Sequence, residues 1–165
     1  MKIMPQATGE LTKLGELIED MSVAMLTTFE EADSALMSRP MAPQELCEKG
    51  AIWFLTDPRS NKVQHLQVMN LAFSNASDAR YVSISGHGEI VTDRALIEHF
   101  WTPFARPWFP DGVESSKLAL LKFVPHTAEY WDSTHSKMVR MLAMAASIVA
   151  AKPIGMGDHG NLNAL

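Results

Sequence analysis

Residues 53–62 combine residue types that suit the binding of a phosphate group. A buried strand leads through the turn Asp57-Pro58-Arg59 to a short helix that begins with Ser60, Asn61 and Lys62. A helix N-terminus presents free backbone N–H groups, and here Ser60 adds a hydroxyl donor and Lys62 a compact cation. Alternatively, Ser60 is only an N-cap residue and Lys62 a solvated surface lysine. The segment alone leaves both interpretations open.

The strand segment Ser38-Arg39-Pro40-Met41 is a second candidate for ligand binding. Proline lacks a backbone donor and is therefore confined to edge strands and bulges. An exposed strand edge beside an arginine could contact a flat, hydrogen-bonding ring and its phosphate. The alternative is an ordinary edge strand from which Arg39 extends into water.

A cluster of aromatic and proline residues forms the third candidate, at residues 101–112. Three prolines and four aromatic residues follow each other so closely that a regular helix or strand is excluded. Such a loop either closes one end of the fold or projects into an interface, where Trp and Arg are enriched.

Charge and composition exclude several classes of function. The net charge of the 165-residue chain is −5 and no run of Lys or Arg occurs, which argues against nucleic-acid binding. The single cysteine, Cys47, permits no intrachain disulfide, and the six histidines lack the short spacings of a metal site. The longest apolar stretch, residues 141–151, is about half the ~20 residues that span a bilayer. Residues 1–13 lack the apolar region of a secretory signal. These features predict a cytoplasmic protein without metal, nucleic-acid or membrane partners.

The hydrophobic pattern predicts a mainly β (α+β) fold with several short strands. A first helix is expected from Thr8, as N-cap, to Asp20, because its apolar residues keep helical spacing. Further short helices are expected at residues 60–67 and 93–101. Turn-forming residues separate the short apolar or alternating runs, as in an antiparallel barrel or sandwich. These runs are residues 22–29, 35–42, 51–56, 70–75, 80–91, 117–124 and 127–131, the last two divided by Pro125.

The C-terminal part is expected to contain a helix followed by a flexible tail. Residues 136–151 have an apolar face that either packs on the domain's own barrel or covers a partner subunit or cleft. Residues 153–165 are rich in Gly and Asn and are expected to be loose. The chain is therefore predicted to be one domain, residues 1–152, with a tail at 153–165.

Six short motifs of this chain, and the order in which they occur, resemble those of the FMN-binding split-barrel superfamily of pyridoxamine 5'-phosphate oxidase. They are most similar to the general stress protein branch of that superfamily. Each motif is weak alone, but together they cover roughly residues 11–132. They are Met25-Leu26-Thr27-Thr28, Ser38-Arg39-Pro40-Met41, Trp53-Phe54-Leu55-Thr56 with Ser60 and Lys62, Tyr81-Val82-Ser83-Ile84-Ser85-Gly86, Trp108-Phe109-Pro110-Asp111-Gly112 and Glu129-Tyr130-Trp131-Asp132.

This resemblance implies a six-stranded antiparallel split β-barrel with flanking helices, which forms a homodimer with FMN in clefts at the subunit interface. In such proteins the positions of Arg39, Ser60 and Lys62 hold the FMN phosphate, and the position of Trp108 approaches from the partner subunit. The implied cofactor-binding residues are Arg39, Pro40, Met41, Trp53, Phe54, Leu55, Thr56, Ser60, Asn61, Lys62 and Trp108.

The resemblance implies an FMN-binding protein of the general stress type that acts as a flavin-dependent oxidoreductase of unknown substrate. Two alternatives are a pyridoxamine 5'-phosphate oxidase and a non-catalytic flavin-binding sensor or carrier. The oxidase is disfavoured because this chain has Asn61 where oxidases usually carry a second arginine, and because its C-terminal segment is rich in Ala and Met. No residue stands out as a catalytic acid or base.

Overall fold

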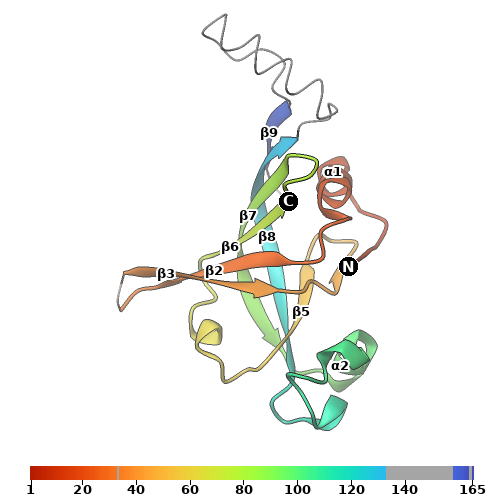
Figure 1. The fold of residues 1–165 in the computed structure, drawn as a ribbon, viewed down its shortest axis with the longest axis vertical. Coiled ribbons are helices and arrows are strands. Elements are labelled where there is room, and N and C mark those ends of the chain that lie inside the picture. Colours follow the sequence, from red (N-terminus) through yellow and green to blue (C-terminus); the bar gives the residue numbers. More distant parts are fainter. Residues whose placement is uncertain (33, 133–157, 164) are drawn as a thin grey trace, which may run out of the picture.

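A large β-sheet dominates the computed structural model, which describes residues 1–32, 34–132, 158–163 and 165 (Figure 1). The nine strands follow the order β1-β4-β5-β8-β7-β6-β2-β3, and β9 pairs with β8 beside this path. They are β1 (Lys2–Ile3), β2 (Ala24–Glu30), β3 (Ala35–Met41), β4 (Glu45–Leu46), β5 (Ile52–Thr56), β6 (Met69–Asn75), β7 (Arg80–Val91), β8 (Ala119–Asp132) and β9 (Asp158–Asn163). The described helices are α1 (Gly9–Ile18), α2 (Arg94–Phe100) and the 3₁₀ turns η1 (Asn61–Gln64), η2 (Pro103–Ala105) and η3 (Gly112–Glu114).

The prediction of a mainly β fold is confirmed, although a count of six strands is too low. Every strand pair is antiparallel except the parallel pair of β1 and β4. The strands β1 and β4 have two residues each, so they are too short to show an alternating pattern. The third strand that the sequence pattern missed is β9.

The two strands predicted on either side of Pro125 are one continuous strand, β8. Gly86 of β7 pairs with Pro125, whereas its neighbour Ser85 pairs with Thr127, so His126 is an extra residue on β8. Such a β-bulge tolerates a proline because the ladder is locally interrupted there. A side chain at position 86 would collide with the backbone of β8, so this close approach requires glycine. The predicted break at Pro125 is therefore wrong.

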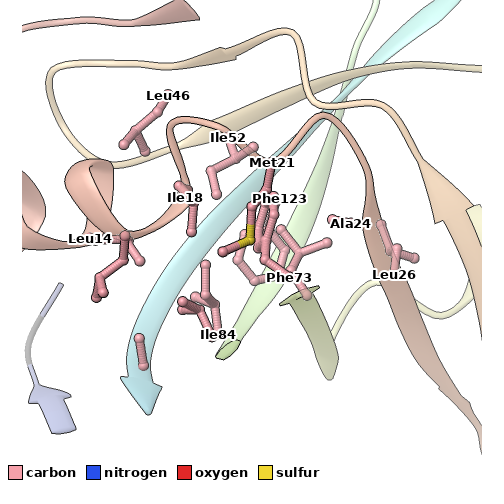
Figure 2. Close-up of a cluster of buried hydrophobic side chains, with 14 of the residues drawn as sticks. Leu14, Ile18, Met21, Ala24, Leu26, Leu46, Ile52, Phe73, Ile84 and Phe123 are labelled. Carbon is pink, nitrogen blue, oxygen red and sulfur yellow. The ribbon is translucent and has the colours of Figure 1, made fainter. Parts of the chain in front are cut away.

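One face of the sheet, called the inward face here, packs against α1 and carries the larger hydrophobic core (Figure 2). As predicted, α1 begins after Thr8, whose hydroxyl accepts a hydrogen bond from the backbone N–H of Leu11 at 3.2 Å. Its buried residues pack against side chains of β2 and β4 to β8, including Leu26, Leu46, Ile52, Leu71, Phe73, Ile84 and Phe123. Burial of one such side chain stabilises the fold by about 1.5–3 kcal/mol, so this core holds the strands in their relative positions.

The opposite, outward face is covered by α2 at only one end of β5, β7 and β8. The predicted helix is present, and its N-cap Asp93 accepts a hydrogen bond from the backbone N–H of Leu96 at 3.0 Å. Ile97 and Phe100 of α2 form a second core with residues of the aromatic loop and with outward side chains of the strands, among them Trp53, Leu55, Val91 and Leu120. Among the described residues, no helix covers the other end of this face, and the β2–β3 hairpin projects from it (Figure 1).

The C-terminal residues differ from the expected loose tail. Residues Asp158–Asn163 form β9, which pairs with β8 from Thr127 to Asp132. Gly160 lies so close to the ring of Tyr130 that a side chain there would collide with it, and Leu162 joins the core. The predicted helix at residues 136–151 lies outside the described residues. No helix in the described part of the chain is long and apolar enough to cross a membrane.

Candidate functional site

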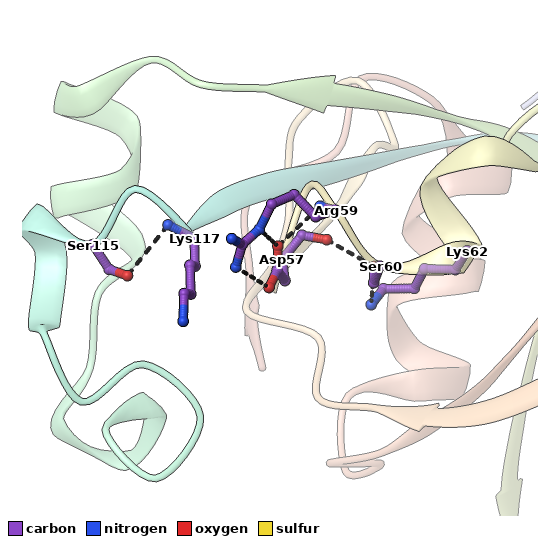
Figure 3. A network of polar contacts seen from close by, with 6 residues as sticks. All are labelled: Asp57, Arg59, Ser60, Lys62, Ser115 and Lys117. Atoms are coloured by element: carbon purple, nitrogen blue, oxygen red, sulfur yellow. Dashed lines mark hydrogen bonds and ion pairs between the residues drawn. The ribbon is translucent and has the colours of Figure 1, made fainter.

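The turn that follows β5 is held by Asp57 (Figure 3). Its backbone carbonyl accepts hydrogen bonds from the backbone N–H of Ser60 at 3.1 Å and from the Ser60 hydroxyl at 2.7 Å. Its carboxylate accepts from the backbone and the guanidinium of Arg59 at 2.9–3.2 Å. These hydrogen bonds lower the pKa of Asp57. Arg59 is therefore engaged in forming the turn.

The turn places Lys62 beside Ser60. The Lys62 ammonium donates a hydrogen bond to the Ser60 hydroxyl at 3.0 Å. The side chain is half-buried, and this burial lowers the pKa of Lys62; the positive charge of Arg39 lowers it further, while Asp57 raises it. An ammonium whose pKa is lowered by burial and by a second cation is one that an anion would stabilise.

Arg39 reaches the same place from β3. The register pairs Arg39 with Leu26 of β2, so its side chain starts on the inward side of the hairpin. Its guanidinium donates a hydrogen bond to the hydroxyl of Thr28 at 3.2 Å, and Thr28 is fully buried. Among the described residues, neither Arg39 nor Lys62 forms an ion pair. Two cations, one on β3 and one on the turn η1, thus lie near each other without a neutralising carboxylate in hydrogen-bonding contact among the described residues.

This arrangement fits a phosphate group. A dianionic phosphate would offset the repulsion between Arg39 and Lys62 and accept charge-assisted hydrogen bonds from both; the Ser60 hydroxyl could donate to it after rotating away from the Asp57 carbonyl. The predicted helix at residues 60–67 is only the four-residue turn η1, so a helix dipole contributes little. The two side-chain cations, and not a helix N-terminus, therefore make this site suitable for an anion.

The predicted residues of β5 are divided between the two faces of the sheet. Phe54 and Thr56 are buried on the inward side, and the buried Thr56 hydroxyl has no hydrogen-bond partner among the residues that the structure describes. Trp53 stacks on Phe100 with ring centroids 5.5 Å apart, and Leu55 packs against the second core. These side chains already have positions in the fold, so the strand would meet a ligand mainly through its backbone.

The predicted residues of the β2–β3 hairpin and of η1 are also divided. Pro40 is exposed on the outward side, whereas Met41 packs against the main core. The side-chain amide of Asn61 donates a hydrogen bond to the carboxylate of Glu30 at 2.7 Å. Asn61 therefore ties the turn η1 to the hairpin.

Trp108 lies in the aromatic loop and is 75% exposed. The neighbouring residues Ala105 and Phe109 are buried in the second core, which anchors the loop while Trp108 points outward. Within the described residues, no hydrogen bond or ring contact joins Trp108 to Arg39 or Lys62. Trp108 is thus available to a second molecule.

Two residues of the site were not found from the sequence. Thr28 was quoted only as part of a motif, and its contact with Arg39 depends on the pairing register of β2 with β3. Glu30 bonds to a residue 31 positions away along the chain. Alternation in β2 could have marked Thr28 as a buried hydroxyl in need of a partner.

The fold and the site define a mainly antiparallel β protein with two neighbouring cations, a candidate anion site, after the end of a buried strand. The chain belongs to the pyridoxamine 5'-phosphate oxidase-like family, whose sequence pattern matches residues 9–154. The family resemblance inferred from the six motifs is thereby confirmed.

Three relatives illustrate the range of the family. Protein bli-3 of Neurospora crassa is 27% identical over 157 residues, which cover 87% of this chain and 75% of that protein. The general stress FMN/FAD binding protein of Xanthomonas citri is 28% identical, with a TM-score of 0.65 over 79% of this chain and 93% of the other. A candidate general stress protein 26 from Jannaschia sp. CCS1 is 24% identical and supports the fold, with a TM-score of 0.68 over 93% of this chain and 98% of the other.

Proposed function

We propose that this protein binds FMN and acts as a flavin-dependent oxidoreductase of the general stress type. The observation that carries the proposal is the convergence of Arg39 and Lys62 beside the Ser60 hydroxyl without an ion-pair partner among the described residues. The description of the Xanthomonas citri relative as an FMN/FAD binding protein supports a flavin as the phosphate-bearing ligand. The flavin supplies the redox chemistry when it is bound, and the protein supplies binding and orientation.

In this proposal, different residues contact different parts of the flavin. Arg39, Ser60 and Lys62 hold the phosphate, and the backbone of Pro40, Met41, Leu55 and Thr56 lines the ribityl chain and the ring. Thr28 keeps the guanidinium of Arg39 in place by accepting its hydrogen bond.

The proposal includes a split barrel, into which the sheet of each subunit closes. It also includes a homodimer, in which Trp108 contacts the flavin of the partner subunit. The uncovered part of the outward face supports the homodimer. Fifteen outward residues on β3, β2, β6 and the adjoining parts of β7 and β8 include a single charged residue, Glu129, whereas a solvated sheet face normally carries several charges; the ion pair of Glu89 and Lys122 lies farther along β7 and β8, outside this group. This dimer face consists of Met25, Thr27, Phe29, Leu36, Ser38, Pro40, Asn70, Ala72, Ser74, Tyr81, Ser83, Ser85, Thr127, Glu129 and Trp131.

Large apolar side chains within the dimer face strengthen this argument. Leu36 is 71% exposed, and Met25, Tyr81 and Trp131 are each exposed by about two fifths. A contiguous exposed surface with little charge and several large apolar groups is typical of a protein interface. We also propose a cytoplasmic location, with which a single cysteine agrees.

Two measurements test the proposal. Purified protein is expected to carry FMN, identified by mass spectrometry after denaturation, or to bind added FMN in a flavin fluorescence titration. Protein that neither carries nor binds FMN would refute it. Sedimentation over a dilution series, with and without FMN, is expected to show a dimer that FMN stabilises by mass action. A monomer that binds FMN with full affinity would refute the shared site.

A third measurement separates the enzyme from the sensor or carrier. Protein loaded with FMN is mixed with candidate electron donors, and the flavin absorbance is followed as it is reduced and then reoxidised. A rate that increases with donor concentration and exceeds that of free FMN is expected for an oxidoreductase. If the rate equals that of free FMN for every donor, the protein is a carrier or sensor.

A further inference from the structure

Two histidines far apart in the sequence meet on the outward face, next to the β-bulge. His87 lies on β7 and His126 is the extra residue of β8. The Nδ1 atom of His87 and the Nε2 atom of His126 are 2.8 Å apart, and the two ring centroids are 4.9 Å apart. The His87 side chain is 34% exposed and His126 is exposed, so solvent reaches both rings.

We propose that this histidine pair binds a first-row divalent transition-metal ion, such as Cu²⁺ or Zn²⁺. Imidazole nitrogens bind Zn²⁺ at about 2.0–2.1 Å, so two that share one ion lie roughly 2.8–3.4 Å apart at bond angles of about 90–110°. The nitrogens of His87 and His126 are within a few tenths of an ångström of that separation. Both belong to neighbouring paired strands, which holds them close together before an ion arrives.

A carboxylate behind His87 favours the tautomer that a metal requires. Oε1 of Glu89 lies 3.7 Å from Nε2 of His87, the nitrogen that faces away from His126. Glu89 is itself held by the ammonium of Lys122, which donates a hydrogen bond to its carboxylate at 2.8 Å. A carboxylate in this position favours hydrogen on Nε2 and leaves the Nδ1 lone pair free toward His126, as in carboxylate–histidine–metal arrangements.

Metal binding at this pair requires no net release of a proton. In the neutral pair one of the two facing nitrogens carries a hydrogen, which it donates to the other. Exchange with water moves this hydrogen to the outer nitrogen of the same ring, and both facing lone pairs then coordinate the ion. The described residues contain no group of three or more His, Cys, Asp or Glu that could hold a metal, so water completes the coordination. We therefore expect an open, exchangeable site that prefers Cu²⁺ to Zn²⁺.

Isothermal titration of the purified protein with CuCl₂ and with ZnCl₂, in a buffer that does not chelate metals, tests this proposal. One ion per chain is expected, with tighter binding of Cu²⁺, and the Cu²⁺ EPR spectrum is expected to show coupling to two nitrogens. The variant His126→Ala should bind at least about 10-fold more weakly and lose one of the two nitrogen couplings. His126 is an exposed bulge residue, so this variant is expected to fold.

Two further variants make the test specific. Glu89→Gln keeps both ligands but loses the carboxylate, and it should weaken binding by about 10-fold. His99→Ala is the matched control, because His99 is also an exposed histidine near a carboxylate, 3.9 Å from Glu45, but has no histidine in ring contact with it within the described part of the chain. It should bind as the unchanged protein does. The proposal is overturned if the unchanged protein binds neither ion, or if His126→Ala binds Cu²⁺ as tightly as His99→Ala. The outcome is independent of FMN binding.

Discussion

Replacing Lys62 by Met should weaken FMN binding much more than it weakens the binding of riboflavin. The substitution keeps most of the side-chain volume and removes only the ammonium group. A hydrogen bond to a charged group contributes about 1.5–3 kcal/mol, which corresponds to a loss of FMN affinity of about 10–100-fold. Riboflavin has the same ring and ribityl chain but no phosphate, so its Kd should change by less than about twofold.

The free protein provides a second readout for the same substitution. Burial and the charge of Arg39 both lower the pKa of Lys62, so the ammonium is placed unfavourably when no anion is bound. Its removal should therefore leave the melting temperature of the FMN-free protein unchanged or raise it. A lysine with a merely structural role would show the opposite, a lower melting temperature together with an unchanged ratio of FMN to riboflavin affinity.

The pH dependence of FMN binding should reflect the same lysine. Protonated Lys62 attracts the phosphate, so FMN affinity should fall as the pH rises through the pKa of Lys62. Because this pKa lies below the ordinary value of 10.5, the loss should begin at a lower pH than a typical lysine would give. The Lys62→Met variant should lack this alkaline step. Lys49→Met, at an exposed lysine before β5, is the control and should bind FMN normally. FMN affinity that is equal in both variants would refute the assignment of Lys62 to the phosphate.

Three further substitutions test the support of the site, the dimer face and the bulge. Thr28→Val removes the hydrogen bond to Arg39, which contributes about 0.5–1.5 kcal/mol. The affinity for FMN should therefore fall by about 3–10-fold, while the affinity for riboflavin stays constant. Ala72→Arg puts a charge in the middle of the dimer face. This variant should sediment as a folded monomer and bind FMN more weakly, whereas Ala95→Arg on α2 should stay dimeric. Gly86→Ala should lower the free energy of unfolding by about 1–3 kcal/mol in urea titrations, because the new methyl group meets the backbone of β8; at Gly9 the same change meets no atom within 4 Å and should cost far less.

Motifs and residue spacing predicted part of the candidate site. Ser60 and Lys62 lie two positions apart, and the turn held by Asp57 brings their side chains together as the local pattern predicted. Arg39 was assigned to the same site through the family resemblance, and its place beside Lys62 agrees with that assignment. The amide of Asn61 bonds to Glu30, a partner that only the packing of η1 on the hairpin provides.

Local patterns in this chain specify the strands and helices, whereas long-range pairing specifies which side chains meet. The alternating runs, the helical patterns and the Thr8 cap predicted β2, β3, β5 to β7, α1 and α2 to within a few residues, because periodicity and capping depend on neighbours in the chain. Strand β9 and the unbroken course of β8 through Pro125 depend on a partner strand and a bulge, which leave no local signal. The meeting of His87 with His126, 39 positions apart, has the same origin: the register of β7 with β8 determines it, and that register is set by the burial of the whole sheet.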